Sequence, residues 1–121
     1  MVATQVSGSL IVRDKKILMF FDDEKQKWSV PMDKGERGEL SAETAVRVAE
    51  EATGCSCDVI RYRSKLKKDY EHGGEEFTLQ PYSLEIEGEP EDSEWVHIKE
   101  IHEKDIVKPF SEMVEKLKDK L

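Results

Sequence analysis

The side chains best able to do chemistry stand in the segment 31–54, where acids and bases follow helical spacing. A polar, glycine-bearing loop feeds a helix predicted over about 41–53. On that helix Glu43, Arg47 and Glu51 succeed one another at intervals of four residues, the spacing of ion pairs on one face. From these residues alone, the segment is interpreted as the solvated face of an amphipathic helix with ion pairs between successive turns.

The same segment resembles the box of the Nudix hydrolase superfamily, in its MutT-like branch, written G-x5-E-x7-R-E-U-x-E-E-x-G-U with U a bulky aliphatic residue. Laid on the chain without gaps, the box spans 33–55 and finds Glu39, Arg47, Glu51 and Gly54 on matching positions. The resemblance extends over roughly residues 5–117. Other positions that agree with common family residues are Trp28, Pro31, Lys34, Glu36, Gly38, Ala45 and Thr53.

The resemblance implies an α+β fold, a Nudix-like α/β/α sandwich with a mixed central sheet, with helices at about 41–53 and 109–121. It also implies a hydrolase of nucleoside diphosphates linked to another group, with Mg²⁺ or Mn²⁺ as cofactor. It assigns Glu51 the role of metal ligand or base, and Arg47 with Glu39 that of an ion pair that shapes the site. Further metal candidates are Glu39 and Asp33, and the substrate-binding candidates are Lys34, Glu36 and Asp33.

The chain departs from the family at the metal-binding positions. Of the three helical glutamates, one stands as Glu51, and the other two positions hold Val48 and Ala52. Met32-Asp33 replaces the paired glycines, and Phe21, Asp22 and Asp23 stand where a basic residue is frequent. We therefore expect weak or absent hydrolysis, weak metal binding, and retained binding of a nucleotide or a partner.

The alternative is an active nucleotide pyrophosphohydrolase whose metal site is rearranged around Glu51 and nearby acids. Asp33 and Glu39 could complete such a site with Glu51. Further acids close to the box, or in the loop before Trp95, are Glu36, Glu50, Glu91, Asp92 and Glu94.

The apolar stripe of the helix places Val48 about 120° from its centre, since each residue advances about 100°. The sequence thus predicts that packing does not require valine at position 48 and that glutamate is tolerated there. Ala52 lies nearer the stripe and is ambiguous. The stripe consists of Ala42, Ala45, Val46, Ala49 and Thr53.

Alternation and turn residues predict the remaining elements. Ser41 is the expected N-cap and Gly54 the terminator of the first helix. A change of phase at Pro81 predicts a bulge or an edge position there. Strands are expected at 6–13, 16–21 (after a turn at 14–15), 28–30, 55–68, 76–87 and 95–98, and an irregular loop at 32–39.

Four cations follow the box with alternate spacing, namely Arg61, Arg63, Lys65 and Lys67. If 55–68 is one strand, they share one of its faces. That face is interpreted either as a solvated surface or as a relocated stripe that binds phosphate or a partner.

Composition limits the partners. The chain of 121 residues carries 27 acids against 19 bases, a formal net charge of −8, which argues against gripping a nucleic-acid duplex or an anionic membrane. Cys55 and Cys57 stand too close in sequence for an unstrained disulfide. The longest apolar stretch, 17–21, is too short for a membrane span. We expect a single cytoplasmic domain over 1–121, with a nucleotide, a second copy or another protein as partner.

Overall fold

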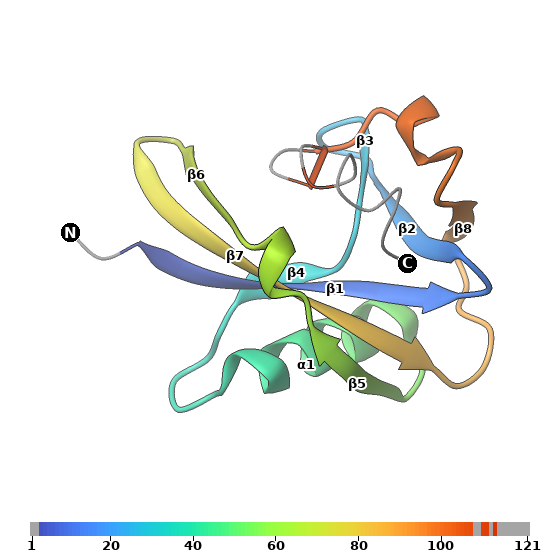
Figure 1. The fold of residues 1–121 in the computed structure, drawn as a ribbon, viewed down its shortest axis with the longest axis horizontal. Coiled ribbons are helices and arrows are strands. Elements are labelled where there is room, and N and C mark those ends of the chain that lie inside the picture. Colours follow the sequence, from blue (N-terminus) through green and yellow to red (C-terminus); the bar gives the residue numbers. More distant parts are fainter. Residues whose placement is uncertain (1–2, 108–109, 112, 114–121) are drawn as a thin grey trace.

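A mixed sheet positions the site, and within the described residues (3–107, 110, 111 and 113) the computed structural model gives it eight strands (Figure 1). The order is β3-β2-β1-β7-β5, with β4 beside β1, β6 beside β7 and β8 beside β2. The elements are β1 Thr4–Arg13, β2 Lys16–Asp22, β3 Lys27–Ser29, β4 Met32–Lys34, α1 Ser41–Thr53, β5 Cys57–Tyr62, β6 Lys68–His72, β7 Glu75–Ile86 and β8 Glu94–His97, with 3₁₀ turns η1 Ser64–Leu66 and η2 Ile101–Glu103.

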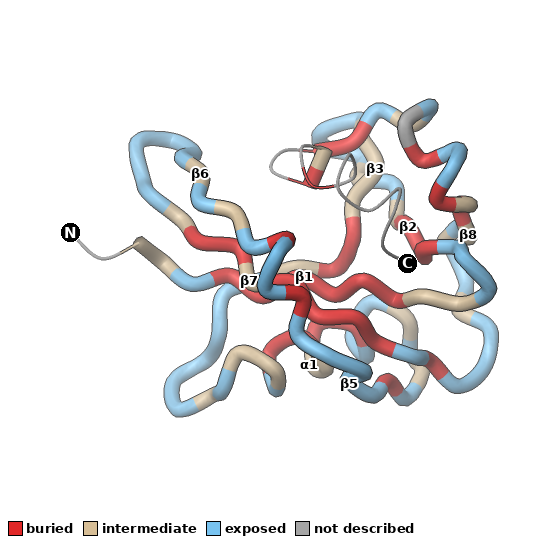
Figure 2. Tube along the Cα trace, in the orientation of Figure 1, coloured by how far each residue is buried: buried red, intermediate tan, exposed pale blue. Residues whose placement is uncertain are grey.

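The centre of the sheet is the parallel pair of β1 and β7, which runs from Thr4 opposite Phe77 to Ile11 opposite Leu84. Buried residues follow both strands (Figure 2). Because successive side chains of a strand point to opposite faces, Leu10 enters one core cluster and Ile11 the other. The cluster with Ile11 packs against α1, so the predicted α+β sandwich with a mixed sheet is confirmed.

Two buried hydroxyls of β1 attach α1 to the sheet. Ser7 Oγ donates to the Ser41 carbonyl at 2.8 Å, and Ser9 Oγ donates to the Ala45 carbonyl at 2.6 Å. A helix carbonyl can accept a second hydrogen bond without losing its helical one, so these contacts satisfy the buried hydroxyls at no cost to α1. They fix the helix along the sheet.

The C-terminal end of α1 is as predicted from the sequence, whereas the N-cap is a different residue. Gly54 terminates the helix with φ 71°, and its N–H donates to the Glu50 carbonyl at 2.8 Å, as predicted. Ser41 is not the N-cap. Leu40 occupies that position, and its N–H donates to the Glu43 carboxylate at 2.9 Å, while Ser41 Oγ bonds the Tyr82 hydroxyl.

The segment 55–68 is not one strand, and the predicted stripe of four cations on one face is wrong. Strand β5 ends at Tyr62 after a register shift between Val59 and Arg61, and η1 follows. Arg63 is buried, and its Nη1 donates to Ser83 Oγ at 3.0 Å. The bulge and the 3₁₀ turn break the alternation on which the stripe depended.

Pro81 lies inside β7, so the predicted bulge or edge position there is also wrong. It stands opposite Gly8 of β1, and its carbonyl accepts the Arg63 N–H at 2.9 Å on the other side. The bulge is on the neighbouring strand β5. Likewise, part of the expected loop 32–39 is strand β4, which pairs with β1.

Strand β6 was not predicted as a separate strand, whereas β1, β2, β3, β7 and β8 begin and end within two residues of the predicted bounds. The expected helix at 109–121 lies largely outside the described residues, although Phe110 and Met113 are buried in the core cluster opposite α1. No helix in the described part of the chain has the length and apolar character needed to cross a membrane.

The β1–β2 turn supports a prediction about stability. Arg13 pairs with Lys16, and both intervening residues have positive φ, 50° at Asp14 and 64° at Lys15. Side chains disfavour this conformation, so Lys15→Gly should raise the free energy of unfolding by about 0.5–1 kcal/mol, measured by urea denaturation. The matched change Lys16→Gly lies in extended backbone of β2 and should lower it by a similar amount. A Lys15→Gly variant less stable than wild type would contradict the turn geometry.

Candidate functional site

The Glu39 carboxylate joins the loop before α1 to the helix. Arg47 Nε donates to Oε2 at 2.9 Å and Nη2 to Oε1 at 3.1 Å, the two-pronged geometry of strong arginine–carboxylate pairs. Oε1 also accepts the Thr44 hydroxyl at 2.6 Å and the Glu36 backbone N–H at 3.0 Å. The structure thus brings Glu39 and Arg47 together, and their part in any reaction stays a prediction.

These contacts have an electrostatic consequence. The Arg47 guanidinium first, and the Thr44 hydroxyl next, stabilise the charged carboxylate and hold the pKa of Glu39 at about 2. Glu39 in turn raises the pKa of Arg47 further above its usual value. Arg47 also donates from Nη1 to Glu51 at 3.3 Å and from Nη2 to the Lys34 carbonyl at 3.2 Å. One arginine therefore ties α1 to β4 and to the loop.

The three helical positions of the box differ in their surroundings. Glu51 is exposed and contacts Arg47, and Ala52 is exposed. Val48 is buried, with 6% of its surface exposed, so the prediction that packing makes no demand at position 48 is wrong. The buried residues of α1 are Thr44, Ala45, Val48 and Ala49, so the covered face of the helix differs from the predicted stripe.

The candidate substrate-binding residues lie along β4 and the following loop. Asp33 Oδ1 accepts the Lys34 backbone N–H at 2.7 Å. Lys34 Nζ lies 5.7 Å from the ring centre of Phe77 and 3.9 Å from Glu75. Glu36 is exposed and 3.8 Å from Arg47. None of the three candidates lines the cleft described next, and their roles remain untested.

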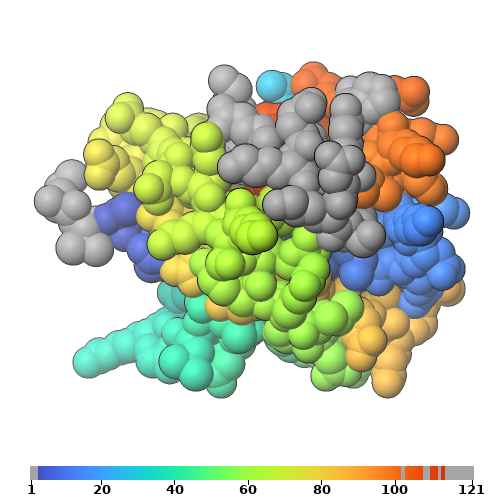
Figure 3. Space-filling model, viewed as in Figure 1, coloured from blue at the N-terminus to red at the C-terminus, as the bar shows by residue number. Residues whose placement is uncertain are grey.

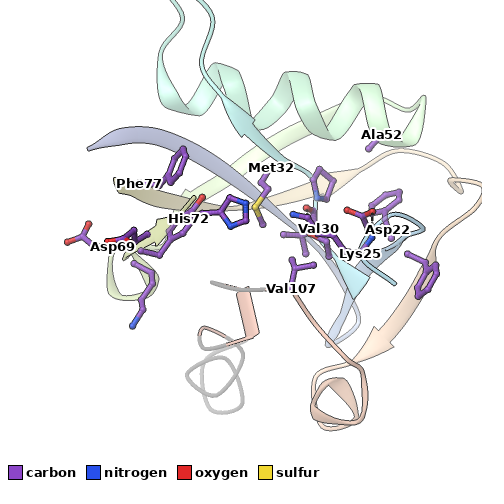
Figure 4. A pocket seen from close by; sticks show the side chains of 16 residues that line it. Asp22, Lys25, Val30, Met32, Ala52, Asp69, His72, Phe77 and Val107 are labelled. Atoms are coloured by element: carbon purple, nitrogen blue, oxygen red, sulfur yellow. Dashed lines mark hydrogen bonds between the residues drawn. The ribbon is translucent and has the colours of Figure 1, made fainter. Parts of the chain in front are cut away.

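A cleft with a volume of about 990 Å³ lies between the β6–β7 hairpin and β2–β3 (Figure 4). Val30, Met32 and Val107 form an apolar centre, and the His72 ring reaches toward Met32 (Figure 4). The contribution of α1 to the lining is Ala52. Charged residues of the lining are Asp22, Lys25, Lys68, Asp69 and Glu71.

Aromatic rings line both walls of the cleft. Tyr70 and Phe77 stack at 5.2 Å with an angle of 18° between their planes. Opposite them, Phe21 meets Trp28 edge to face at 5.4 Å. The cleft roles of Tyr70, Phe77 and His72 were missed from the sequence. The sequence does indicate a turn at Gly73-Gly74, and Tyr70 and Phe77 are symmetric about it, so their pairing across this turn was the available signal.

Three carboxylates of the box, those of Glu36, Glu39 and Glu51, lie within 4 Å of the Arg47 guanidinium. Within the described residues, no group of three or more His, Cys, Asp or Glu side chains is placed to hold a metal ion. The role of Asp33, Glu39 and Glu51 as metal ligands stays a prediction. Two acids of the later loop, Glu91 and Asp92, share a smaller hollow with Ala52. Glu94 instead pairs with Lys104.

Comparison with known proteins settles the family. A family model described as NUDIX domain matches residues 3–117. The chain therefore belongs to the Nudix family, in agreement with the interpretation of the box. No curated protein matches the chain in sequence.

Solved structures agree on the fold. The chain is similar to a UDP-X diphosphatase with a TM-score of 0.80 and 19% identity, over 97% of this chain and 62% of that one, so it spans less than two thirds of that protein. The E. coli ORF135 protein is similar with a TM-score of 0.79 and 19% identity, over 97% of this chain and 89% of that one. A MutT Nudix hydrolase from Burkholderia pseudomallei is similar with a TM-score of 0.77 and 20% identity, over 97% of this chain and 99% of that one.

The depressed pKa of Glu39 predicts how acid affects stability. Because the folded-state pKa is about 2 and the ordinary value is 4.5, the carboxylate stabilises the folded protein above pH 4.5. This contribution falls as pH drops from 4.5 toward 2. Glu39→Gln should lower the urea midpoint at pH 7 and flatten its decline between pH 4.5 and 2.

The matched control is Glu36→Gln, which removes an exposed carboxylate at 3.8 Å from the same arginine. It should leave the urea midpoint and its pH dependence close to wild type. Equal effects of the two substitutions would contradict the special position of Glu39.

Proposed function

We propose that this Nudix protein binds a nucleotide in the cleft between β2–β3 and β6–β7 and hydrolyses it weakly or not at all. Mg²⁺ or Mn²⁺ binds weakly, if at all, without the nucleotide. The observation that supports this most directly is the point where the cleft meets α1, because Ala52 lines it. A methyl group stands where the family box has a metal-binding glutamate.

The other carboxylates of the box do not replace it. Position 48 holds a buried valine. Glu39 already accepts four hydrogen bonds, three of them on Oε1, and coordination of a cation would compete with a guanidinium for its charge. Glu51 is left as one exposed carboxylate, and hard divalent cations need several oxygen ligands. The residues present therefore do not fit the metal site of the family.

The cleft suits a nucleoside better than a bare polyphosphate. Tyr70 and Phe77 offer π faces on which a base can stack, and Val30 and Met32 give it an apolar floor. Three acids and two lysines line the same space, so its charge does not favour anions. Base stacking is therefore the main expected source of affinity, and the phosphates are expected to extend toward α1.

A second candidate function is hydrolysis by a rearranged metal site. It is favoured by the hollow that Glu91 and Asp92 share with Ala52, since these acids approach the helix position that lacks its own. The experiments below separate the two functions.

Restoring the missing carboxylates tests the proposal. In wild type, Mn²⁺ should bind in the millimolar range or more weakly by calorimetry. Ala52→Glu adds an exposed carboxylate beside Glu51, and Val48→Glu with Ala52→Glu should tighten Mn²⁺ binding at least tenfold. Because position 48 is buried, the double variant should melt below wild type without metal and recover part of the loss when Mn²⁺ binds.

The control carries glutamine at both positions, which matches the shape of glutamate without its charge, and should not gain affinity. A folded double variant that binds Mn²⁺ no better than wild type contradicts the assignment of positions 48 and 52. Micromolar affinity and rapid turnover of a nucleotide panel by wild type would overturn weak hydrolysis and establish the rearranged site.

Nucleotide binding has its own test. Tyr70→Leu keeps much of the apolar volume and removes the stacking face, so it should weaken ADP binding by about fivefold or more in metal-free buffer, measured by calorimetry. Tyr62→Leu changes a tyrosine of β5 outside the cleft and should leave ADP affinity unchanged. Equal affinity of wild type and Tyr70→Leu would place the nucleotide elsewhere, and no detectable ADP binding by wild type would contradict the proposal.

A further inference from the structure

A second hollow lies on the other side of α1, between the helix and strand β5, with a volume of about 750 Å³. Its floor is apolar, made of Ala42, Val46 and Val59. Its rim includes Glu43, Glu50 and Asp58. This α1–β5 groove shares no residue with the cleft of the proposed function.

Strand β5 forms the open edge of the sheet at this groove. Within the described part of the chain it pairs with β7 and with no other strand. Its apolar side chains are unusually exposed for their type, with 37% of the surface of Val59, 51% of Ile60 and 40% of Tyr62 accessible. This part of the chain lies uncovered at the molecular surface (Figure 3). An exposed apolar edge strand is a surface suited to pairing with another chain.

The bulge at Ile60 gathers these side chains toward α1. Val59 stands opposite Leu84 and Tyr62 opposite Tyr82, and both partners belong to the core cluster that packs against the helix. Directly paired residues project to the same face of a sheet, so Val59 and Tyr62 both lie on the α1 side. Without the extra residue, Tyr62 would point to the opposite face.

The charges of β5 are self-complementary. Its sequence from Cys57 to Tyr62 is C-D-V-I-R-Y. Because of the bulge at Ile60, Asp58 and Arg61 each lie one register step from Val59, opposite Glu85 and Ser83, and they share one face of the strand. Both charged side chains are exposed. In an antiparallel pairing of two such strands about Val59, each Asp58 stands opposite an Arg61, within reach of an ion pair.

We propose that β5 is the interface of a twofold homodimer, in which the β5 edges of two copies lie antiparallel. Val59 of one copy meets Val59 of the second copy, and Asp58 meets Arg61 of the second copy at two symmetric places. This is an isologous contact, in which one patch serves both subunits. The two α1–β5 grooves then adjoin across the axis, and the helix acids lie at the rim.

Two features of the chain set the strength of this contact. The bulge interrupts a regular backbone ladder, so side chains carry much of the association. Each copy also carries a net charge of −8, which opposes the approach of a second copy. We therefore expect a weak dimer, with Kd on the order of 10–100 μM, as is usual for a small interface.

A charge exchange tests the proposal by sedimentation from 5 to 500 μM (roughly a tenth to ten times the expected Kd) in about 0.15 M salt, where long-range repulsion is screened. Asp58→Arg alone and Arg61→Asp alone each place like charges opposite one another twice, and each should weaken the dimer at least tenfold. The double variant with both changes restores the complementarity and should dimerise within about threefold of wild type. Lys99→Glu, an exposed charge reversal next to β8, is the control and should leave Kd unchanged.

Melting curves establish that each variant is folded, and Val59→Lys gives an independent disruption by placing a cation at the centre of the contact. A wild type that stays monomeric to 500 μM overturns the proposal and leaves the groove to a different occupant. A dimer that survives the single charge reversals, or that the double variant fails to restore, places the interface elsewhere. ADP binding by the monomeric variants is expected to persist, so failure here is distinguishable from failure of the proposed function.

Discussion

The Glu39 carboxylate is the contact on which the geometry of the box depends. It receives the guanidinium of Arg47, the Thr44 hydroxyl and the Glu36 N–H, and so closes the loop 35–39 onto the first turns of α1. A Cβ at Gly35 would lie 3.1 Å from Thr44 Oγ1, so the close approach of this loop favours a glycine. The loop and the helix are thus joined through one carboxylate, by hydrogen bonds and an ion pair.

The box thus separates into a framework part and a ligand part. Glu39, Arg47 and Gly54 make contacts or adopt a conformation that any loop–helix–turn of this shape needs. Positions 48 and 52 are the ligand part, and neither holds a carboxylate here. Val48 is buried and Ala52 is exposed. Valine at 48 adds apolar burial to α1, where an ionised glutamate would have to be desolvated or neutralised. Packing of the helix and metal binding are competing uses of that position.

Features of the fold that depend on interactions between residues close in sequence could be predicted, and features that depend on tertiary contacts could not. The helix, its glycine terminator and the β1–β2 turn follow from local preferences, and they were predicted correctly. The Glu39–Arg47 contact followed from a matched motif. The end of strand β5 at Tyr62 could not be predicted from the alternation of apolar and polar residues. The bulge adds one residue to the strand, so Val59 and Tyr62 project to the same face although they stand three residues apart. The burial of Val48 could not be predicted from the apolar stripe, because tertiary contacts of α1 with β1, β4, β5 and β7 decide which face of the helix is covered.

The loss of two glutamates has opposite consequences for binding and for catalysis under the proposed function. In a complete box, a divalent cation neutralises the clustered carboxylates and the substrate phosphates together, so that neither needs to be solvated. Without Glu at 52, the end of the cleft at α1 carries one negative charge fewer, and a phosphate approaching Ala52 meets less repulsion. Under the proposed function, a nucleotide is then expected to bind without a cation. The charge that a bound cation would contribute in the transition state is not replaced, because α1 contributes an alanine to the lining of the cleft. We therefore expect binding to outlast hydrolysis when this position changes, since repulsion is relieved by removing charge while catalysis requires charge to be added.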